Sequence, residues 1–258
     1  MTSKMTQNIA QILKVRINGS RQQEALSQIL AFVANSCLPA GRRGATVSKK
    51  LIIFTPNPEF LVAASRDQGF RRLLNQSDIN IADGFGLIWS SRFLGQPLPE
   101  RVSGADLVAK LLKIGSEKKW AVGIAGARVG NLKESQEQLS RLQTKYPGIK
   151  FTNLDAPQLK IENCKLKIVL ACHGMGRQER WIMENKERIP AKVFLGIGGA
   201  LDFLSGFARR APFWMRETGL EWLWRALRRP GHWKRIFTAV VVFPWLVVRE
   251  KFQLEFGI

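Results

Sequence analysis

Short apolar runs alternate with amphipathic stretches along most of the chain, and this alternation is typical of an α/β protein. Buried strands are predicted over residues 51–54, 79–82, 120–125, 149–152, 166–171 and 193–197. Apolar positions at helical spacing predict helices over residues 24–33, 58–74, 86–94, 104–114, 129–146 and 178–186. Residues 1–14 are expected to form an irregular start, and residues 39–50, rich in Gly and Arg, a loop. The pattern predicts a Rossmann-like, mostly parallel sheet covered by helices on both faces.

The C-terminal segment departs from this pattern. Residues 236–248 are apolar apart from Thr238 and are interrupted by Pro244, and this run is shorter than the roughly 18–20 residues that span a bilayer as a helix. A basic, tryptophan-rich stretch precedes it, which favours an element lying in the interface of an anionic membrane. The alternative is a helix or strand that packs on the core and exposes a basic face. We therefore predict a catalytic α/β domain over residues 1–220 and a membrane-associating appendage over residues 221–258.

Charge narrows the classes of partner. The formal net charge is +20 and 45% of the residues are hydrophobic, so a globular core carries a strongly basic surface. Such a surface attracts polyanions, which are either nucleic acids or anionic membranes. No recognised nucleic-acid motif accompanies the charge, so we expect no nucleic-acid partner, and a basic nucleic-acid-binding α/β protein is kept as the alternative function.

Cysteine and histidine are scarce. The chain has three cysteines, at positions 37, 164 and 172, and two histidines, at positions 173 and 232. Their spacing fits neither a zinc site nor a disulfide framework, so we predict free thiols in a reducing cytoplasm and no bound metal. The N-terminal residues lack the continuous apolar region of a secretion signal.

Polar residues follow two of the predicted strands. Thr55 and Asn57 come after the strand over 51–54, Asp83 ends the run over 79–82 beside Gly84 and Gly86, and Arg101 lies downstream. Open α/β sheets place their chemistry at the carboxyl ends of strands, so an acid and an arginine there suggest a base beside an anion site. A carboxylate that only caps a helix is the other interpretation of Asp83.

Two glycine-rich turns also follow predicted strands. One contains Gly126, and the other contains Gly198 and Gly199 with Asp202 just beyond. Bare backbone N–H groups in such turns can hold phosphate or sugar oxygens, whereas a tight turn that needs glycine for packing is the alternative. Neither turn has the G-x-G-x-x-G spacing, which disfavours a dinucleotide-dependent oxidoreductase.

Seven ordered motifs carry a family resemblance: TPNPEFLVAA, IADGFGL, ERVSGADL, YPGI, GMGRQERWI, GIGGALDFLSGFARRAP and GLEWLWR. In this order the chain resembles the WecG/TagA/CpsF family of glycosyltransferases, from about residue 15 to about residue 229. The resemblance implies inverting transfer of an N-acetylhexosamine-type sugar from a UDP-sugar to a polyprenyl-diphosphate-linked sugar. The expected sugar is N-acetylmannosamine or its uronic acid, and the product serves surface polysaccharide or teichoic acid synthesis.

The resemblance also implies roles for individual residues. Asp83 matches the family's aspartate and is the candidate base, Thr55 and Asn57 would position sugar hydroxyls, and Arg101 would contact a diphosphate. Residues expected near the nucleotide, the donor sugar or the lipid diphosphate are Gly126, Gln178, Glu179, Gly198, Gly199, Asp202, Arg225, Arg228 and Arg229. No Asp-x-Asp occurs in the chain, so metal-independent transfer without a cofactor is expected, with arginines supplying positive charge. The enzyme would work at the inner face of the cell membrane, and a homo-oligomer is compatible with the sequence.

One position departs from the family pattern. The family usually has Gly-x-Pro-Lys-Gln-Glu, whereas this chain has Gly176 in place of the proline, two residues before Gln178. Glycine frees a φ angle that proline fixes, so the shape of this loop is expected to differ.

Overall fold

A computed structural model describes residues 8–34, 50–128, 130–156, 165–228, 231 and 233–257. The side chains of Arg225, Ala226 and Arg228 fall outside that description. The loop predicted over residues 39–50 lies outside it too, except for Lys50.

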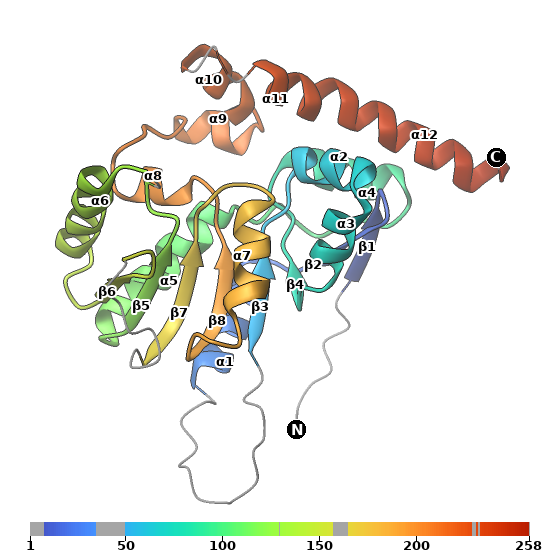
Figure 1. The fold of residues 1–258 in the computed structure, drawn as a ribbon. Coiled ribbons are helices and arrows are strands. Elements are labelled where there is room, and N and C mark those ends of the chain that lie inside the picture. The colour runs from blue at the N-terminus through green and yellow to red at the C-terminus, as the bar shows by residue number, and fades with distance from the viewer. Residues whose placement is uncertain are drawn as a thin grey trace, which may run out of the picture.

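The core of the molecule is a parallel sheet of six strands (Figure 1). Its order is β4-β3-β8-β7-β5-β6, and each neighbouring pair is parallel. The strands are β3 (Leu51–Phe54), β4 (Ile79–Asn80), β5 (Ala121–Ala125), β6 (Lys150–Asn153), β7 (Leu166–Ala171) and β8 (Ala191–Gly196). The predicted α/β class and parallel sheet are therefore confirmed.

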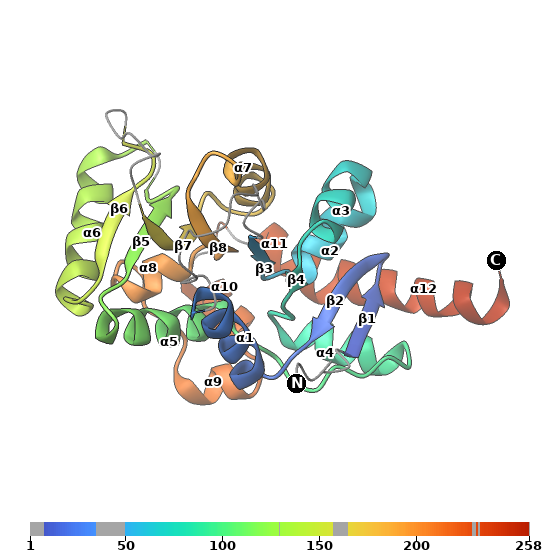
Figure 2. The ribbon, with the colours of Figure 1, turned by 90° about the horizontal axis from the view of Figure 1, so that it is seen from below.

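Helices cover both faces of the sheet (Figures 1 and 2). One face carries α1 (Gln22–Ala34), α5 (Gly104–Glu117), α6 (Leu132–Lys145) and α8 (Ala200–Leu204), and the other carries α2 (Pro58–Arg66), α3 (Gln68–Asn75) and α7 (Arg177–Asn185). Along β3, Ile52 and Phe54 join one apolar cluster while Leu51 and Ile53 join the other. Both faces of the strand are buried, which is why its sequence is continuously apolar.

Several element boundaries differ from the prediction, among them those of two helices and one strand. The single helix expected over 58–74 is two helices, because Asp67 ends α2 and its side chain accepts a hydrogen bond from the Phe70 N–H that caps α3. The helix expected from residue 129 begins at Leu132, after the capping residue Asn131, and residue 129 itself is outside the described residues. The strand expected over 79–82 is shorter, since β4 ends at Asn80.

The irregular start expected over residues 1–14 is wrong for the part that the structure describes. Strands β1 (Asn8–Ile12) and β2 (Val15–Gly19) form an antiparallel hairpin. Its turn residues, Leu13 and Lys14, have φ angles of 48° and 62°, although tight hairpin turns of this kind favour Asn and Gly. Tertiary contacts hold the turn instead: the Leu13 N–H donates to Glu250 at 2.8 Å, and the Lys14 carbonyl accepts from Asn75 at 3.0 Å.

The C-terminal residues are helical (Figure 1, red). They form α9 (Phe213–Glu217), α10 (Glu221–Arg228), α11 (Trp233–Phe237), the π-helix η3 (Thr238–Val242) and α12 (Phe243–Phe256). Pro244 lacks the N–H that would pair with the carbonyl four residues earlier in an α-helix. The π-helix η3 ends at Val242, just before this proline.

This helical segment has a buried side and an exposed side. Phe243 and Val247 are fully buried in the apolar cluster that includes residues of α2 and of α4 (Phe85–Phe93). Exposed apolar side chains on the same segment are Trp233, Phe237, Val240, Val241, Trp245, Phe252, Leu254 and Phe256. Packing on the core, the alternative raised by the sequence, thus accounts for one side of the segment only. Among the described residues, no helix combines the length and the apolar character needed to span a membrane.

Candidate active site

One cavity of about 970 Å³ opens at the carboxyl ends of β3, β4, β7 and β8. Parallel sheets bind their ligands at this edge. Eight of the predicted site residues line it: Thr55, Asn57, Asp83, Arg101, Gln178, Gly198, Gly199 and Asp202. Segments distant in the sequence therefore meet in one place, as the prediction from the strand ends required.

The turn that carries Asp83 is shaped by two glycines with different functions. The Asp83 N–H donates to the Pro56 carbonyl at 3.0 Å, which fixes the turn against the end of β3. Gly84 has a φ of +129°, a conformation that residues with a side chain rarely adopt. At Gly86 an added Cβ would lie 2.8 Å from Pro58 and 3.4 Å from Phe243, so this glycine mainly lets α2 pack closely on α4.

Thr55 and Asn57 reach the cavity with part of their hydrogen-bonding capacity already used. The Thr55 hydroxyl donates to the Gly196 carbonyl at 2.9 Å, so its oxygen is left to act as an acceptor. The Asn57 side-chain oxygen caps α2 by accepting from the N–H groups of Glu59 and Phe60 at 3.0 and 3.3 Å. For a bound sugar, Asn57 can therefore offer its amide N–H groups.

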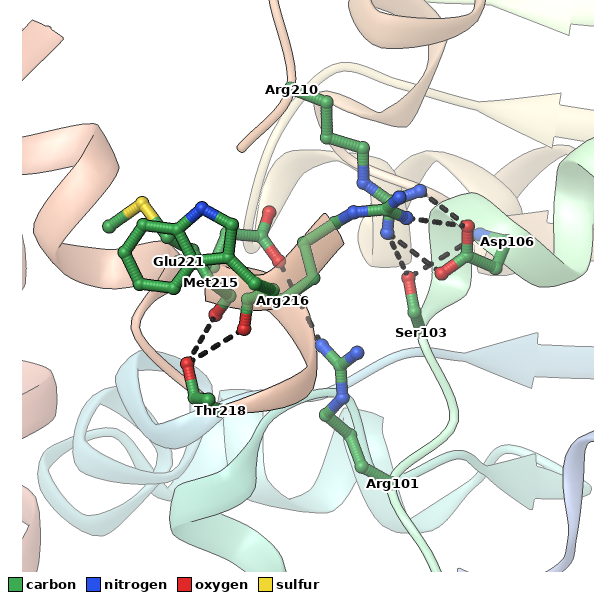
Figure 3. A network of polar contacts seen from close by, with 9 residues as sticks. Arg101, Ser103, Asp106, Arg210, Met215, Arg216, Thr218 and Glu221 are labelled. Carbon is green, nitrogen blue, oxygen red and sulfur yellow. Dashed lines mark hydrogen bonds and ion pairs between the residues drawn. The ribbon is translucent and has the colours of Figure 1, made fainter. Parts of the chain in front are cut away.

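Arg101 stands at the meeting point of α4 and the C-terminal helices (Figure 3). Its guanidinium lies 4.9 Å from the centre of the Phe85 ring and 3.8 Å from the Glu221 carboxylate at the start of α10. A pair this long is a weak ion pair, so the arginine can be drawn to a more highly charged anion.

A second cationic group, absent from the sequence prediction, lies beside it. Arg210 donates to both oxygens of Asp106 and, at 2.8 Å, to Ser103, while Arg216 lies 3.6 Å from the same carboxylate (Figure 3). Burial by itself would raise the pKa of Asp106, but the hydrogen bond and the charge of Arg210 outweigh it and hold that pKa below its usual value.

Asp83 belongs to the same electrostatic group. Burial tends to lower the pKa of Arg210, yet the charges of Asp106, Glu221 and Asp83 raise it overall. Three arginines and three carboxylates thus share this corner: Arg101, Arg210, Arg216, Asp83, Asp106 and Glu221. The charges of these six groups cancel, so any anion that binds here would have to compete with the carboxylates for the arginines.

The sequence contained one indication of this arginine cluster. Ser103 and Asp106 have the S-x-x-D spacing of a helix start, and Ser103 indeed caps α5 by accepting from the Asp106 N–H. Arg210 stands in the quoted ARRAP stretch, but it lies 104 residues from Asp106, and no local pattern links them.

Gln178 and Glu179 form a buried support under the cavity. Gln178 accepts from the Gly198 N–H at 2.8 Å and donates to Glu179 at 2.6 Å, and Glu179 also accepts from the Gly176 N–H at 2.7 Å. Burial raises the pKa of Glu179 to about 7, against the lowering effect of these hydrogen bonds. Gln178 touches the cavity, whereas Glu179, fully buried, is absent from its described lining.

Gly176, which replaces the family's proline, enables part of this support. Its φ is +80°, far from the roughly −65° that proline imposes. Proline also has no N–H, so the hydrogen bond to Glu179 requires a residue other than proline here. The departure therefore changes both the shape of the loop and its hydrogen bonding.

The two glycine turns have different surroundings. The Gly126 N–H donates to Asp155 at 2.5 Å, and an added Cβ would lie 2.5 Å from the His173 backbone nitrogen. Gly126 does not belong to the described lining of the cavity, and its contacts favour the packing interpretation. Gly198 and Gly199 line the cavity, and no described atom lies within 4 Å of an added Cβ at either.

Asp202, beyond the second turn, is held at the cavity wall. It accepts from Gln138 at 2.9 Å and lies 3.4 Å from Arg128. The guanidiniums of Arg128 and Arg141 stand 4.6 and 4.4 Å from the centre of the Phe207 ring, which also lines the cavity. This part of the site therefore combines a hydrogen-bond acceptor, the Asp202 carboxylate, with the aromatic ring of Phe207.

Several predicted residues lie outside the description. Arg229 and His232 are not described, nor are Cys37 and Cys164, and only the backbones of Arg225 and Arg228 are placed, on α10. Within the described ranges, no three or more His, Cys, Asp or Glu residues are grouped so as to hold a metal ion. The described thiol, Cys172, is free; its S–H donates to the Ala125 carbonyl at 3.0 Å, and burial raises its pKa.

Comparison with known proteins gives consistent matches over the whole length. The model of the glycosyl transferase WecG/TagA/CpsF family matches residues 10–256. A protein of Staphylococcus aureus strain MRSA252 is 30% identical over 254 residues, which cover 95% of this chain and 94% of the relative. A protein of strain MW2 is 29% identical with the same coverage. Both are named N-acetylglucosaminyldiphosphoundecaprenol N-acetyl-beta-D-mannosaminyltransferase.

Proposed function

The chain belongs to the WecG/TagA/CpsF family of glycosyl transferases, so it is an enzyme that transfers a sugar, and we propose its substrates. The donor is a UDP-activated N-acetylmannosamine-type sugar, and the acceptor is N-acetylglucosamine on a polyprenyl diphosphate. The relatives' names support this choice of sugar and lipid. The observation that carries the proposal is that Asp83 shares one cavity with the paired arginines Arg101 and Arg210. The product would enter a teichoic acid or another surface polysaccharide.

Asp83 is the proposed general base. The acceptor hydroxyl oxygen attacks the anomeric carbon of the donor, its proton passes to the Asp83 carboxylate, and the bond to UDP breaks with the electron pair leaving on the diphosphate. Attack opposite the leaving group inverts the anomeric carbon. The β linkage in the relatives' printed name is what inversion of an α-linked donor produces.

The arginines are the proposed electrostatic catalysts. Charge builds on the diphosphate as the bond to the sugar breaks, and guanidinium groups that are already positioned stabilise it. Arg101 is the stronger candidate because its partner Glu221 lies 3.8 Å away, whereas Arg210 is bound to Asp106 and Ser103. Arg225, Arg228 and Arg229 remain proposed contacts from the C-terminal segment.

The remaining wall is assigned to the donor. Thr55 offers the sugar an acceptor oxygen, and Asn57 offers it amide N–H groups. The turn at Gly198 and Gly199, together with Asp202, faces the nucleotide. Gln178 and Glu179 keep that turn in place from below. A cavity of about 970 Å³ is at the large end of the range for ligand sites, which suits two substrates bound together.

Membrane placement is part of the proposal. The C-terminal helices expose aromatic and aliphatic side chains, and the basic residues Lys234 and Arg249 stand among them, while Arg235 is ion-paired with Glu59 at 2.7 Å. Basic residues near an anionic surface contribute about 1 kcal/mol each, and buried apolar side chains add to that attachment. We place residues 221–258 on the inner face of the cell membrane, with the active site turned toward the lipid acceptor.

One assay tests the proposed reaction. The purified protein is offered a panel of UDP-sugars together with N-acetylglucosaminyl diphosphate lipid, and UDP release is measured. Release that needs both the acceptor and an N-acetylmannosamine-type donor supports the proposal. Salt-sensitive DNA binding with no UDP release would favour the nucleic-acid-binding alternative instead.

The same assay tests metal independence. We expect the rate to persist in excess EDTA, because arginines take the part that a divalent ion plays in many sugar-nucleotide transferases. Loss of activity with EDTA and its return with magnesium or manganese would refute the arginine mechanism.

A further inference from the structure

The cavity that contains Asp83 continues into an apolar groove. Beyond Arg101 its wall is formed by Trp89 of α4, Trp222 of α10, and Ile236 and Val240 of the segment α11–η3. The polar corner with Asp83 and Arg101 and this apolar groove belong to the lining of one cavity. A single ligand can therefore occupy both.

The groove holds apolar side chains that are only partly covered. Trp89 is 44% exposed, Trp222 is 38% exposed and Val240 is 40% exposed. Exposed apolar area costs free energy that burial against a ligand would recover, and contiguous apolar area of this kind marks interaction sites.

The geometry of the C-terminal helix separates the groove from the outer surface. Ile236, Val240 and Pro244 are spaced four residues apart and line the cavity. Phe237 and Val241 each follow one of these residues by one position, are about half exposed, and do not belong to the described lining. The helical segment thus presents one apolar stripe to the groove and another to the surroundings, and the ion pair of Arg235 with Glu59, at 2.7 Å, lines the cavity beside the groove stripe.

We propose that this groove, between α4 and the α11–η3 segment, binds the isoprenoid chain of the lipid acceptor. The inference rests on the proposed function, which requires an acceptor with a diphosphate at one end and a polyprenyl chain at the other. One cavity provides both kinds of surface, the arginines with Asp83 and the apolar stripe of Ile236, Val240 and Pro244. The groove sets the direction of the acceptor, so its terminal sugar points at Asp83.

Two adjacent valines give a matched test. Val240 lines the groove and Val241 does not, while their side chains are similarly exposed, 40% and 49%. Val240→Asn and Val241→Asn are assayed in detergent micelles with two acceptors that share one sugar-diphosphate head, one on a short soluble alkyl chain and one on a long polyprenyl chain. Thermal unfolding shows that both variants are folded.

The expected result is specific to chain length. Val240→Asn should raise the KM for the long acceptor about tenfold, the factor that follows from losing the burial of one aliphatic side chain. Its KM for the short acceptor and for the UDP-sugar should stay within about twofold of the wild type, as should every constant of Val241→Asn. Equal effects of the two variants, or equal effects on the two acceptors, would overturn the proposal.

A second measurement does not depend on turnover. A photoreactive isoprenoid diphosphate without any sugar should cross-link to Trp89 or to residues 236–244. Cross-links in the groove combined with no sugar transfer would refute the proposed reaction and keep the groove. Transfer to the long acceptor with cross-links elsewhere on the protein would refute the groove and keep the proposed reaction.

Discussion

Two glycine turns leave the same edge of one sheet, the first after β5 and the second after β8, and they have opposite surroundings. Gly126 is closed in, with its N–H on Asp155 and His173 against its α-carbon. Gly199 is open, and no described atom would touch a methyl group added there. A glycine in a strand-to-helix turn can therefore serve packing or ligand access, and the neighbouring strand decides which. The enclosed side of the sheet edge, around Gly126, should therefore govern stability. The open side, where Gly199 and Asp83 line the cavity, should govern catalysis. We call these the closed end and the open end.

Asp83→Asn is the strongest test of the open end. The substitution keeps the size of the side chain and removes its basicity, so turnover should fall about 10²–10⁴-fold, the scale for loss of a general base. UDP-sugar affinity and the unfolding free energy should change little. Steady-state kinetics alongside thermal unfolding check this, and near-normal turnover would remove Asp83 from the role of base.

Gly126→Ala tests the closed end. The added methyl would lie 2.5 Å from the His173 nitrogen at a residue whose φ is +82°, so the unfolding free energy should fall by about 3 kcal/mol from overpacking and strain together. Gly130→Ala is the matched control, because it has a φ of +90° in the same turn and no described atom within 4 Å. The control should lose only about 1–2 kcal/mol. Equal losses measured by denaturant unfolding would show that His173 exerts no packing constraint.

Glu179 connects the open turn to the pH dependence of stability. Its pKa is raised to about 7 in the folded protein, above the roughly 4.3 of an unfolded chain, so the folded state keeps a proton that the unfolded state releases. The stability contributed by this group is therefore full below about pH 4 and declines as the pH rises to about 7, by about 4 kcal/mol in total.

Glu179→Gln should flatten that decline, which denaturant unfolding at a series of pH values between about 4 and 8 measures. Glu184→Gln is the control, since it removes an exposed carboxylate from the same helix. An unchanged slope in the Glu179 variant would mean that its carboxyl group titrates normally in the folded protein.

Gly199→Ala should have the smallest effect on stability and still affect the open end. Its backbone does not need glycine, because φ is −79°, so the unfolding free energy should change by less than about 0.5 kcal/mol. The methyl group would project toward the cavity and raise the KM for the donor by a few fold. An unchanged donor KM would place the nucleotide away from this turn.

The sequence predicted the central strands β3, β5, β7 and β8 well because they are buried on both faces and so are largely apolar. It also placed Asp83, Thr55 and Asn57 at one edge, since parallel strands end together, whereas Gln178 was expected there only from the family resemblance. It missed the N-terminal hairpin because Leu13 and Lys14 carry none of the usual turn signals and rely on Glu250 and Asn75.

Features of the site were also missed because they depend on contacts between residues that are distant in the sequence. Nothing local distinguishes Gly126 from Gly199, since the distinction comes from His173 on a neighbouring strand end. Arg210, in the segment between α8 and α9, acquires its place from Asp106 on α5. Local patterns specify elements, whereas contacts between distant segments specify which polar groups remain available for chemistry.

The contact between the hairpin turn and Glu250 has a consequence for the order of events during synthesis. Leu13 and Glu250 are 237 positions apart, so Leu13 is translated long before Glu250. At the roughly 5–20 residues per second of translation, the strained turn waits on the order of 10–50 s for its hydrogen-bond partner. The hairpin is thus among the first segments to leave the ribosome and among the last to be locked, so the nascent chain acquires its complete native contacts only after α12 has been translated.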